Sequence, residues 1–323
     1  MSSVPGLFDR IRSTCSEVTR RARFVRIDAA ALSAFADRLA RGPWPEDDLD
    51  PAHQFRGGDL DTLCFTIALD AINFGSGWFP VLRKREGMSG YRTIASACKE
   101  RFEAEGCWDG AMLRGATPEA MAQLLGQDLA EPQVAELMAL FARAWRELGL
   151  WLLERHSDRF DEVVREAEHS AERLVSALAE MTLYRDVARY EELEVPLYKR
   201  AQITVADLHR AFGDAPYGQF EDLDRLTLFA DNLVPHVLRC NGVLVYEAGL
   251  ARRIDAEELL VPGSSEETEI RAVAVEVVER LVAELAGLGC PTTAHALDGL
   301  LWNAGQAPEV KARPRHRARS TFY

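Results

Sequence analysis

The sequence lacks every short motif that would assign a cofactor chemistry. It contains no GxGxxG or P-loop for a nucleotide cofactor, no GxSxG for a nucleophilic serine, and no HExxH or Cys/His spacing for zinc. Its seven histidines are scattered, and none forms a ligand pair at helical spacing. Dinucleotide, serine-triad and zinc chemistries therefore have no support, and we expect neither a cofactor nor a metal.

Cysteines are few, and long apolar runs are missing. The six cysteines form no CxxC pair, and several stand among apolar residues, as Cys64 does between Leu63 and Phe65. We therefore expect buried, reduced thiols rather than disulfides. No stretch approaches the roughly 18 apolar residues of a membrane span, and residues 1–26 lack the apolar core of a secretory signal. The expectation is a cytoplasmic protein with no membrane partner.

Positive charge is also in short supply. The 323 residues include 38 Lys+Arg and 51 Asp+Glu, which gives a formal net charge of −13. An acidic surface repels a polyphosphate backbone, so DNA and polymeric RNA are disfavoured as partners. One small phosphate is not excluded, because it needs only two or three local cations. With 47% hydrophobic residues, the chain can build a sizeable core.

Helical periodicity dominates what is present. The predicted helices cover about residues 28–39, 59–74, 91–105, 131–181 (as two long helices), 197–212, 265–285 and 293–304, and a further helix is expected to start at Pro118. Only Val243–Tyr246 and, more weakly, Phe24–Ile27 have the β-branched look of a strand. We expect an all-α fold in one compact domain over residues 1–323, with at most a short hairpin. That domain could contain an N-terminal helical subdomain (1–130) packed on a core (131–323), and segment 42–58 is expected to be a long ordered loop or a subdomain boundary.

One carboxylate lies within the apolar segment 226–239. Asp231 is expensive to desolvate there unless it is paired or has a task. Pro235 cannot donate a hydrogen bond to the Asp231 carbonyl, so either a helix kinks here or a new one starts with Pro235 in its first turn. In the second case Asp231 lies at a positive helix end. The sequence favours a capping aspartate at least as much as a catalytic one.

A second carboxylate stands beside an aromatic ring. On a helix over residues 293–304, His295, Asp298 and Trp302 form one stripe. A carboxylate next to an aromatic wall suits binding of a flat, hydrogen-bonding ring. The alternative is an exposed aspartate beside a core tryptophan, which would be the usual interpretation of an isolated short helix.

Cations and aromatic residues mark three more segments. Tyr198 and Lys199 stand at a helix start, where free backbone N–H groups attract an anion, although a solvated charged face is the common alternative. Phe74, followed by a glycine-rich turn and Trp78, could form a stacking platform. The basic run 313–319 could recruit anions or could simply be a solubilising terminus.

Taken together and in order, these segments resemble the queuosine salvage protein family of N-glycosylases. The resemblance covers roughly residues 50–323. The matching residues are Asn73-Phe74, Trp78, Gly90-Tyr91-Arg92, Tyr198 to Gln202, Val205-Ala206-Asp207, Phe229-Ala230-Asp231 with Pro235, Glu267 to Arg271, Leu297-Asp298, Leu301-Trp302, His316-Arg317 and Phe322-Tyr323.

The resemblance implies a helical fold akin to DNA glycosylases and a free nucleotide, queuosine 5′-monophosphate, as the substrate. It also implies hydrolysis of the C1′–N9 bond without a cofactor, giving queuine and ribose 5-phosphate. The acidic charge balance fits a small substrate independently of the resemblance.

The substrate suggests roles for the two carboxylates. Glycoside cleavage passes through an oxocarbenium-like state, which a carboxylate under the ribose can stabilise or trap, and we assign that role to Asp231. Because a 7-deazapurine has no N7 to protonate, departure of the base must be assisted elsewhere, and Asp298 is the candidate for binding another edge. Lys199 is the first candidate for the 5′-phosphate. The full set of binding candidates is His53, Phe74, Trp78, Tyr198, Lys199, Arg200, Phe229, Asn232, Trp302 and His316.

Two other functions stay open at this stage. A glycosylase that acts on a damaged base in DNA or RNA would follow from the fold, but the net charge of −13 speaks against it. A helical protein that binds queuine-like ligands without turnover is the alternative from another class.

Overall fold

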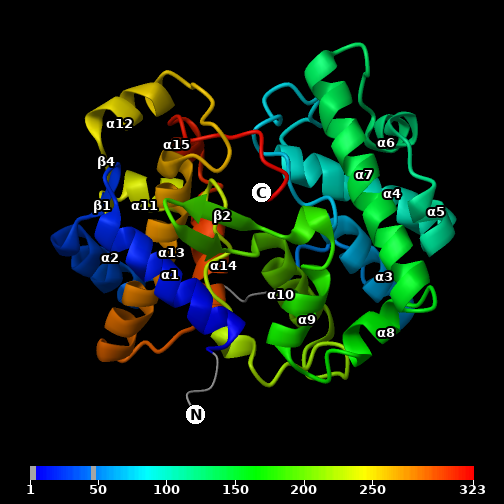
Figure 1. Cartoon of the computed structure of the whole chain (residues 1–323), viewed down its shortest axis with the longest axis horizontal. Coiled ribbons are helices and arrows are strands. Elements are labelled where there is room, and N and C mark those ends of the chain that lie inside the picture. The colour runs from blue at the N-terminus through cyan, green and yellow to red at the C-terminus, as the bar shows by residue number, and fades with distance from the viewer. Residues whose placement is uncertain (1–4, 45–48) are drawn as a thin grey trace. The chain divides into compact units, whose positions relative to one another are not determined.

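The structure is a computed structural model that describes residues 5–44 and 49–323. In these ranges the chain forms fifteen α-helices and four short strands, which confirms the predominantly helical class (Figure 1). The expected loop 42–58 is only partly covered, because residues 45–48 lie outside the described residues. None of the helices in the described ranges has the length and apolar character needed to cross a bilayer.

The chain divides into two compact units that interleave along the sequence. Unit 1 combines Met1–Asp47, Asp186–Lys199 and Asp222–Arg319. Unit 2 combines Asp48–Arg185, Arg200–Glu221 and Ser320–Tyr323. The expected single domain, with its possible helical subdomain over 1–130, stays a prediction.

Unit 1 is built around the long helix α13. This helix (Ser265–Gly287) packs against α1, α2, α11 and α14 and against both strand pairs. The whole stretch 267–275 is buried, although it includes three charged side chains. The other helices of unit 1 are α1 (Leu7–Arg21), α2 (Ala29–Arg41), η2 (Leu223–Arg225), α11 (Val234–Cys240), α12 (Ala248–Asp255), α14 (Ala294–Ala304) and α15 (Pro308–Lys311).

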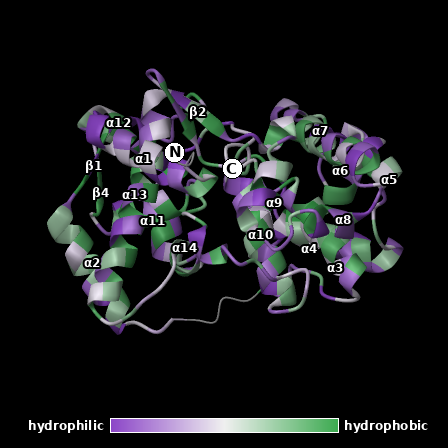
Figure 2. Ribbon diagram, turned by 60° about the horizontal axis from the view of Figure 1, so that its bottom comes forward, coloured by the Kyte–Doolittle hydropathy of each residue, from purple (hydrophilic) through white to green (hydrophobic). Residues whose placement is uncertain are grey.

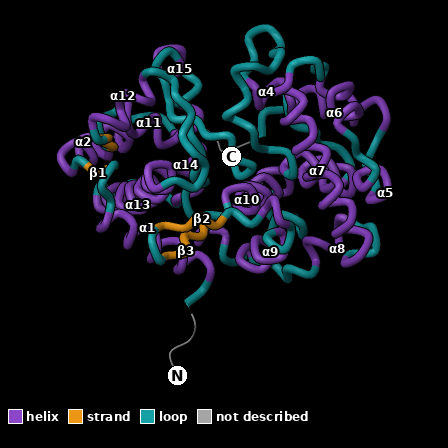
Figure 3. Tube along the Cα trace, turned by 45° about the horizontal axis from the view of Figure 1, so that its top comes forward, coloured by secondary structure: helices purple, strands orange, loops and turns teal. Residues whose placement is uncertain are grey.

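Two antiparallel strand pairs belong to unit 1 (Figure 3). β1 (Val25–Ile27) pairs with β4 (Leu244–Tyr246), which confirms the two strands expected from the sequence. The hairpin of β2 (Val187–Tyr190) and β3 (Leu193–Pro196) was not foreseen. Its turn contains Glu191 at φ 54° and no glycine, so the usual sequence signal of a tight hairpin is missing.

Unit 2 is organised by α7 (Pro132–Arg155), on which α5 and α6 pack. Gly149 of α7 permits the close approach, because a side chain there would meet the backbone of Gly110 and Arg114. The other helices of unit 2 are α3 (Asp59–Asp70), α4 (Gly90–Glu105), α5 (Gly110–Arg114), α6 (Pro118–Leu125), α8 (Phe160–Arg165), α9 (Ala171–Leu178), η1 (Thr182–Tyr184) and α10 (Lys199–Phe212), whose first residue belongs to unit 1.

Local capping chemistry sets many of the helix ends. The side chains of Asp28, Thr117 and Thr293 each accept a hydrogen bond from an N–H in the first turn of the helix that follows. Gly106, at φ 81°, ends α4 in a conformation that favours glycine. Figure 2 shows hydrophobic and hydrophilic residues on the same helices, the pattern of helices that have one face in a core.

The expected helices of residues 131–181 were wrong. Residues 131–181 form one long helix followed by the short helices α8 and α9, not two long helices. The chain breaks at two pairs of non-glycine residues with positive φ, Ser157-Asp158 and Glu168-His169, which give no glycine or proline signal.

The cysteines also differ from the expectation. Cys64 and Cys107 form a disulfide with Cα atoms 6.1 Å apart, and the other four cysteines are free. The bond joins α3 to the segment that follows α4. The helices α3 and α4 themselves pack together in unit 2. Its partners are 43 residues apart, so the pairing follows from packing and not from local spacing.

Candidate functional site

Asp231 lies in a turn immediately before α11. The helix begins at Val234 with Pro235 in its first turn, so the chain starts a new helix rather than kinking an old one. Asp231 Oδ1 accepts hydrogen bonds from the N–H groups of Leu233 (2.8 Å) and Val234 (3.0 Å). Asp231 thus supports the turn that leads into α11, while the N-cap position itself is occupied by Leu233. Only Oδ1 is used in these contacts, and the half-buried side chain leaves Oδ2 free for another contact in the described part of the chain.

The two residues before Asp231 are held from two other helices. The N–H of Phe229 donates to Oδ1 of Asp298 on α14 (3.2 Å). Nε of Arg271 on α13 donates to the carbonyl oxygen of Ala230 (2.9 Å). With the cap at Asp231, three consecutive residues of this loop are fixed by contacts with α14, α13 and α11.

Asp298 is buried, at 6% exposure, so the alternative of an exposed aspartate is wrong. Trp302, one helical turn further along α14, is half-buried. The structure therefore brings Asp298 together with the Asp231 loop inside unit 1. The carboxylate supports that loop whatever else it binds.

The start of α10 is tied to a third buried carboxylate. The carbonyl of Asp186 accepts hydrogen bonds from the N–H groups of Leu197 (2.9 Å) and Tyr198 (3.1 Å). The side-chain Oδ2 of Asp186 accepts one from the N–H of Lys199 (3.1 Å). Tyr198 has φ 45°, a conformation that turns the chain sharply into the helix. Lys199 is 6% exposed, so it is not part of a solvated charged face.

Asp186 is paired with Arg271 in the interior of unit 1. The guanidinium Nη1 and Nη2 lie 3.0 and 2.6 Å from Oδ1 and Oδ2 of Asp186, a two-pronged contact. The Arg271 and Asp186 side chains are each 2% exposed. Glu267 stands 3.7 Å from the same guanidinium, one turn earlier on α13.

His316 and Asn232 meet behind the Asp231 loop. Asn232 Nδ2 donates to the backbone carbonyl of His316 (3.3 Å). Burial, with Arg271 and other cations nearby, lowers the pKa of His316 to about 3. The imidazole is therefore neutral near pH 7. As a binding candidate, His316 can therefore offer a hydrogen bond to the substrate but no positive charge.

Arg315 is a cation near Asp231 that the sequence did not single out. Burial lowers the pKa of its guanidinium, and the negative charge of Asp231 acts in the opposite direction. The two side chains are thus within electrostatic reach of each other in unit 1. The only sequence signal was the general abundance of arginine in residues 313–319.

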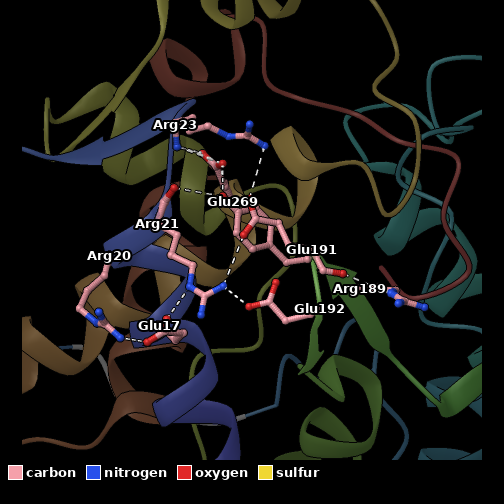
Figure 4. Close-up of polar contacts among 9 residues, drawn as sticks. Glu17, Arg20, Arg21, Arg23, Arg189, Glu191, Glu192 and Glu269 are labelled. Carbon is pink, nitrogen blue, oxygen red and sulfur yellow. Dashed lines mark hydrogen bonds and ion pairs between the residues drawn. The ribbon is translucent and has the colours of Figure 1, made fainter.

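Glu269 also holds part of unit 1 together (Figure 4). Its carboxylate accepts hydrogen bonds from the backbone N–H groups of Arg23, Phe24 and Val25 and from the Tyr190 hydroxyl. Burial and this carboxylate raise the pKa of Tyr190 to about 12. In the sequence, Glu269 was noted only as part of the matching segment Glu267 to Arg271. A charged residue within an apolar helix could have identified it, because a buried carboxylate needs hydrogen-bond partners.

Four of the predicted binding residues belong to unit 2, and three of them lie in its core. The Arg200 guanidinium donates to the carbonyls of Ala71 and Leu183 and stacks on the ring of Phe74, with its Cζ 4.8 Å from the ring centroid. Arg200 is only 1% exposed. These contacts explain it as a packing residue, and they separate its role from that of its neighbour Lys199.

Phe74 and Trp78 have packing partners too. Phe74 lies edge-on to Phe141, with ring centroids 5.0 Å apart. Trp78 Nε1 donates to Oε2 of Glu136 (2.8 Å). Each ring is 2% exposed, so neither presents an open stacking face within unit 2.

His53 is the fourth predicted binding residue in unit 2. It is 8% exposed, and its Nδ1 lies 2.8 Å from the hydroxyl of Ser96. Its Nε2 lies 3.6 Å from Asp50 Oδ2. Burial lowers the pKa of His53, which favours the neutral imidazole.

A second polar cluster of unit 2 contains two of the matching residues that had no assigned role. The Tyr91 hydroxyl accepts a hydrogen bond from Gln54 (2.8 Å), and Asp207 pairs with Arg210 (2.8 Å). Burial raises the pKa of Tyr91 well above its usual value, and the charges of Asp207 and Asp70 add to the effect.

Unit 2 also contains a cavity of about 350 Å³, lined by Arg83, Lys84 and Arg85 and by the end of α6. None of the predicted site residues lines it. In the described ranges, no group of three or more His, Cys, Asp or Glu side chains is placed to hold a metal ion.

Comparisons with known proteins agree with one another. Residues 53–323 match the family described as queuosine salvage protein. The chain is 33% identical over 318 residues to a queuosine 5′-phosphate N-glycosylase/hydrolase of Sphaerobacter thermophilus, covering 97% of both chains. Proteins of the same name from Dictyostelium discoideum (33% over 264 residues, 81% of this chain and 78% of the relative) and Mus musculus (28% over 343 residues, 97% and 98%) are also similar.

Proposed function

Because this chain belongs to the queuosine salvage protein family, we propose that it hydrolyses the N-glycosidic bond of queuosine 5′-phosphate and releases queuine for salvage. In this reaction the C1′–N9 bond breaks, water supplies the hydroxyl at C1′, and ribose 5-phosphate is the second product. The names of the similar proteins support the substrate, and the net charge of −13 favours a free nucleotide over a nucleic acid.

Asp231 acts on the ribose. As C1′–N9 lengthens, positive charge grows on C1′ and the ring oxygen, and a fixed carboxylate stabilises it. The observation that carries this assignment is the geometry of the turn: Oδ1 is held by the N–H groups of Leu233 and Val234 at the start of α11, and Oδ2 is left for the sugar. A carboxylate held in this way does not have to reorganise when the charge develops.

Asp298 and Lys199 bind the two ends of the nucleotide. Asp298 already accepts the Phe229 N–H through Oδ1, and its carboxylate takes a hydrogen-bonding edge of the departing base. Trp302 on the same helix, with Phe229 and Asn232 beside Asp231, completes the binding set of unit 1. Lys199, at the start of α10 after Tyr198, neutralises the 5′-phosphate.

The test is a chromatographic assay for free queuine. Wild-type protein is incubated with queuosine 5′-monophosphate and, separately, with GMP, and Asp231→Asn is run in parallel. We expect release only from the modified nucleotide and a loss of at least about a hundredfold in Asp231→Asn, the size of effect seen when a transition-state charge loses its partner.

Asp37→Asn is the matched control, because Asp37 is an exposed residue of α2 whose ion pair with Arg41 is solvated. It should retain full activity. Tight binding of the nucleotide without release of queuine would refute the hydrolase and favour a carrier. Release from a base-modified oligonucleotide in place of the free nucleotide would favour a nucleic-acid glycosylase.

A further inference from the structure

The matching segment Glu267–Arg271 has no role in the reaction described so far. Arg271 is its one cation, is only 1% exposed, and contacts residues far away in the sequence. One of them is Ala230, the residue immediately before Asp231. Another is Asp186, 85 positions earlier, which precedes the β2–β3 hairpin.

In the buried ion pair of Arg271 with Asp186, Arg271 fixes the backbone next to Asp231. Its Nε donates to the Ala230 carbonyl at 2.9 Å, while both Nη atoms are occupied by Asp186. A guanidinium is planar, so these three contacts fix the direction from Asp186 to the Asp231 loop. Lysine could keep the charge at this position but could not make the three contacts together.

The Asp186 side fixes the backbone at Lys199. The carbonyl of Asp186 holds the N–H groups of Leu197 and Tyr198, and its Oδ2 holds the N–H of Lys199 at 3.1 Å. Oδ2 therefore binds Arg271 and the first residue of α10 at once. A single buried carboxylate links the proposed phosphate-binding helix start to the proposed catalytic loop.

We infer that Arg271 and Asp186 are positioning residues, which hold Asp231 and Lys199 at the separation that the ribose 5-phosphate of the substrate requires. The inference rests on the proposed function of these two side chains. The 5′-phosphate then anchors the ribose at a fixed place over Asp231, so binding energy from the phosphate is used at the C1′–N9 bond.

Stability alone does not account for such a pair. Removing two charges from water costs as much free energy as their attraction returns, and apolar residues of similar volume commonly replace buried ion pairs without loss of stability. The pair supplies direction instead, because six hydrogen bonds meet at one guanidinium and one aspartate and tie the backbone at Ala230 to the backbone of residues 197–199.

A double-mutant cycle in the full chain tests the inference. Lys199→Met, Arg271→Lys and the combination are compared with wild type for kcat and KM on queuosine 5′-monophosphate. Lys199→Met alone is expected to lower kcat/KM about a hundredfold. In the Arg271→Lys background the same change should cost tenfold or less, because the phosphate anchor is already uncoupled from Asp231.

The KM-against-kcat split gives a second readout. Arg271→Lys is expected to lower kcat at least tenfold and to change KM by less than about threefold, since a misplaced anchor still binds the nucleotide but aligns it poorly. Asp186→Asn, which keeps the size of the side chain, should show the same signature. It replaces Arg271→Lys in the cycle if that variant does not fold.

Arg280→Lys is the matched control, because Arg280 lies on the same helix in an exposed pair with Glu276. Its effect should multiply with that of Lys199→Met. If the Arg271→Lys and Lys199→Met effects also multiply, the positioning role is refuted. That outcome differs from failure of the proposed function, in which wild-type protein itself would release no queuine.

Discussion

Replacing Glu269 with glutamine tests how unit 1 holds its N-terminal strand. The carboxylate is fully buried and accepts four different donors (Figure 4). Three of them, the N–H groups of Arg23, Phe24 and Val25, converge on Oε2 at 3.0, 2.6 and 3.1 Å. Glutamine has the same shape, so the change removes the charge with little change in volume.

The expected loss follows from these contacts. A hydrogen bond to a charged acceptor contributes about 1.5–3 kcal/mol and a neutral one about 1 kcal/mol. The amide oxygen of glutamine can take the place of Oε2, which leaves three neutral bonds where there were three charge-assisted ones. The difference is about 3 kcal/mol, or a decrease in Tm of about 6–12 °C at roughly 2–4 °C per kcal/mol.

The assay combines thermal or urea unfolding with hydrogen exchange. The amides of Arg23, Phe24 and Val25 should lose protection in Glu269→Gln, because their acceptor is weakened. Tyr190→Phe is the control: it removes one charge-assisted donor at 2.8 Å, should cost about 1.5–3 kcal/mol, and should leave the three amides protected because the carboxylate keeps its backbone donors. A Tm within 2 °C of wild type for Glu269→Gln, with unchanged protection of the three amides, would refute this reasoning.

Two further predictions concern the cysteines and His316. Alkylation of unreduced, denatured protein should label four cysteines, and labelling of all six would refute the pairing of Cys64 with Cys107. Cys107→Ser should lower the free energy of unfolding by up to about 4 kcal/mol, the loop-closure value for a 43-residue separation. Because the pKa of His316 is lowered from 6.5 to about 3, the unfolded chain binds a proton that the folded protein does not, so stability is complete above pH 6.5 and is lost as the pH falls toward 3. His316→Gln should reduce the slope of unfolding free energy against pH by at most about 1.4 kcal/mol per pH unit in that window. The slope is measured by urea unfolding at pH 7, 5.5 and 4.5. Equal slopes for the variant and the wild type would contradict a neutral buried imidazole.

The candidate site was recognisable from sequence to different degrees. Asp231 stood out because a carboxylate in an apolar run needs a partner, and Pro235 restricted how the helix could begin; both inferences use residues within a few positions of each other. Lys199 and Arg200 are adjacent cations, and both were binding candidates, with Lys199 first for the phosphate. Only packing separates them, since the Arg200 guanidinium binds the carbonyls of Ala71 and Leu183 in unit 2.

The sequence by itself determined the helical class, the helix starts capped by Asp28 and Thr117, and the two strands that became β1 and β4. These features depend on side chains that act on their own neighbourhood, within one or two turns, so they can be predicted without knowing the fold.

Tertiary structure alone decided which distant groups share a buried site. The Asp186–Arg271 pair and the Cys64–Cys107 bond join residues 85 and 43 positions apart, and neither spacing has a local meaning. The breaks at Ser157-Asp158 and Glu168-His169 place ordinary residues at positive φ, a cost that only the surrounding packing can offset. Burial also turned His316 from a possible cation into a neutral ring, because the cost of desolvating a charge depends on everything packed around it.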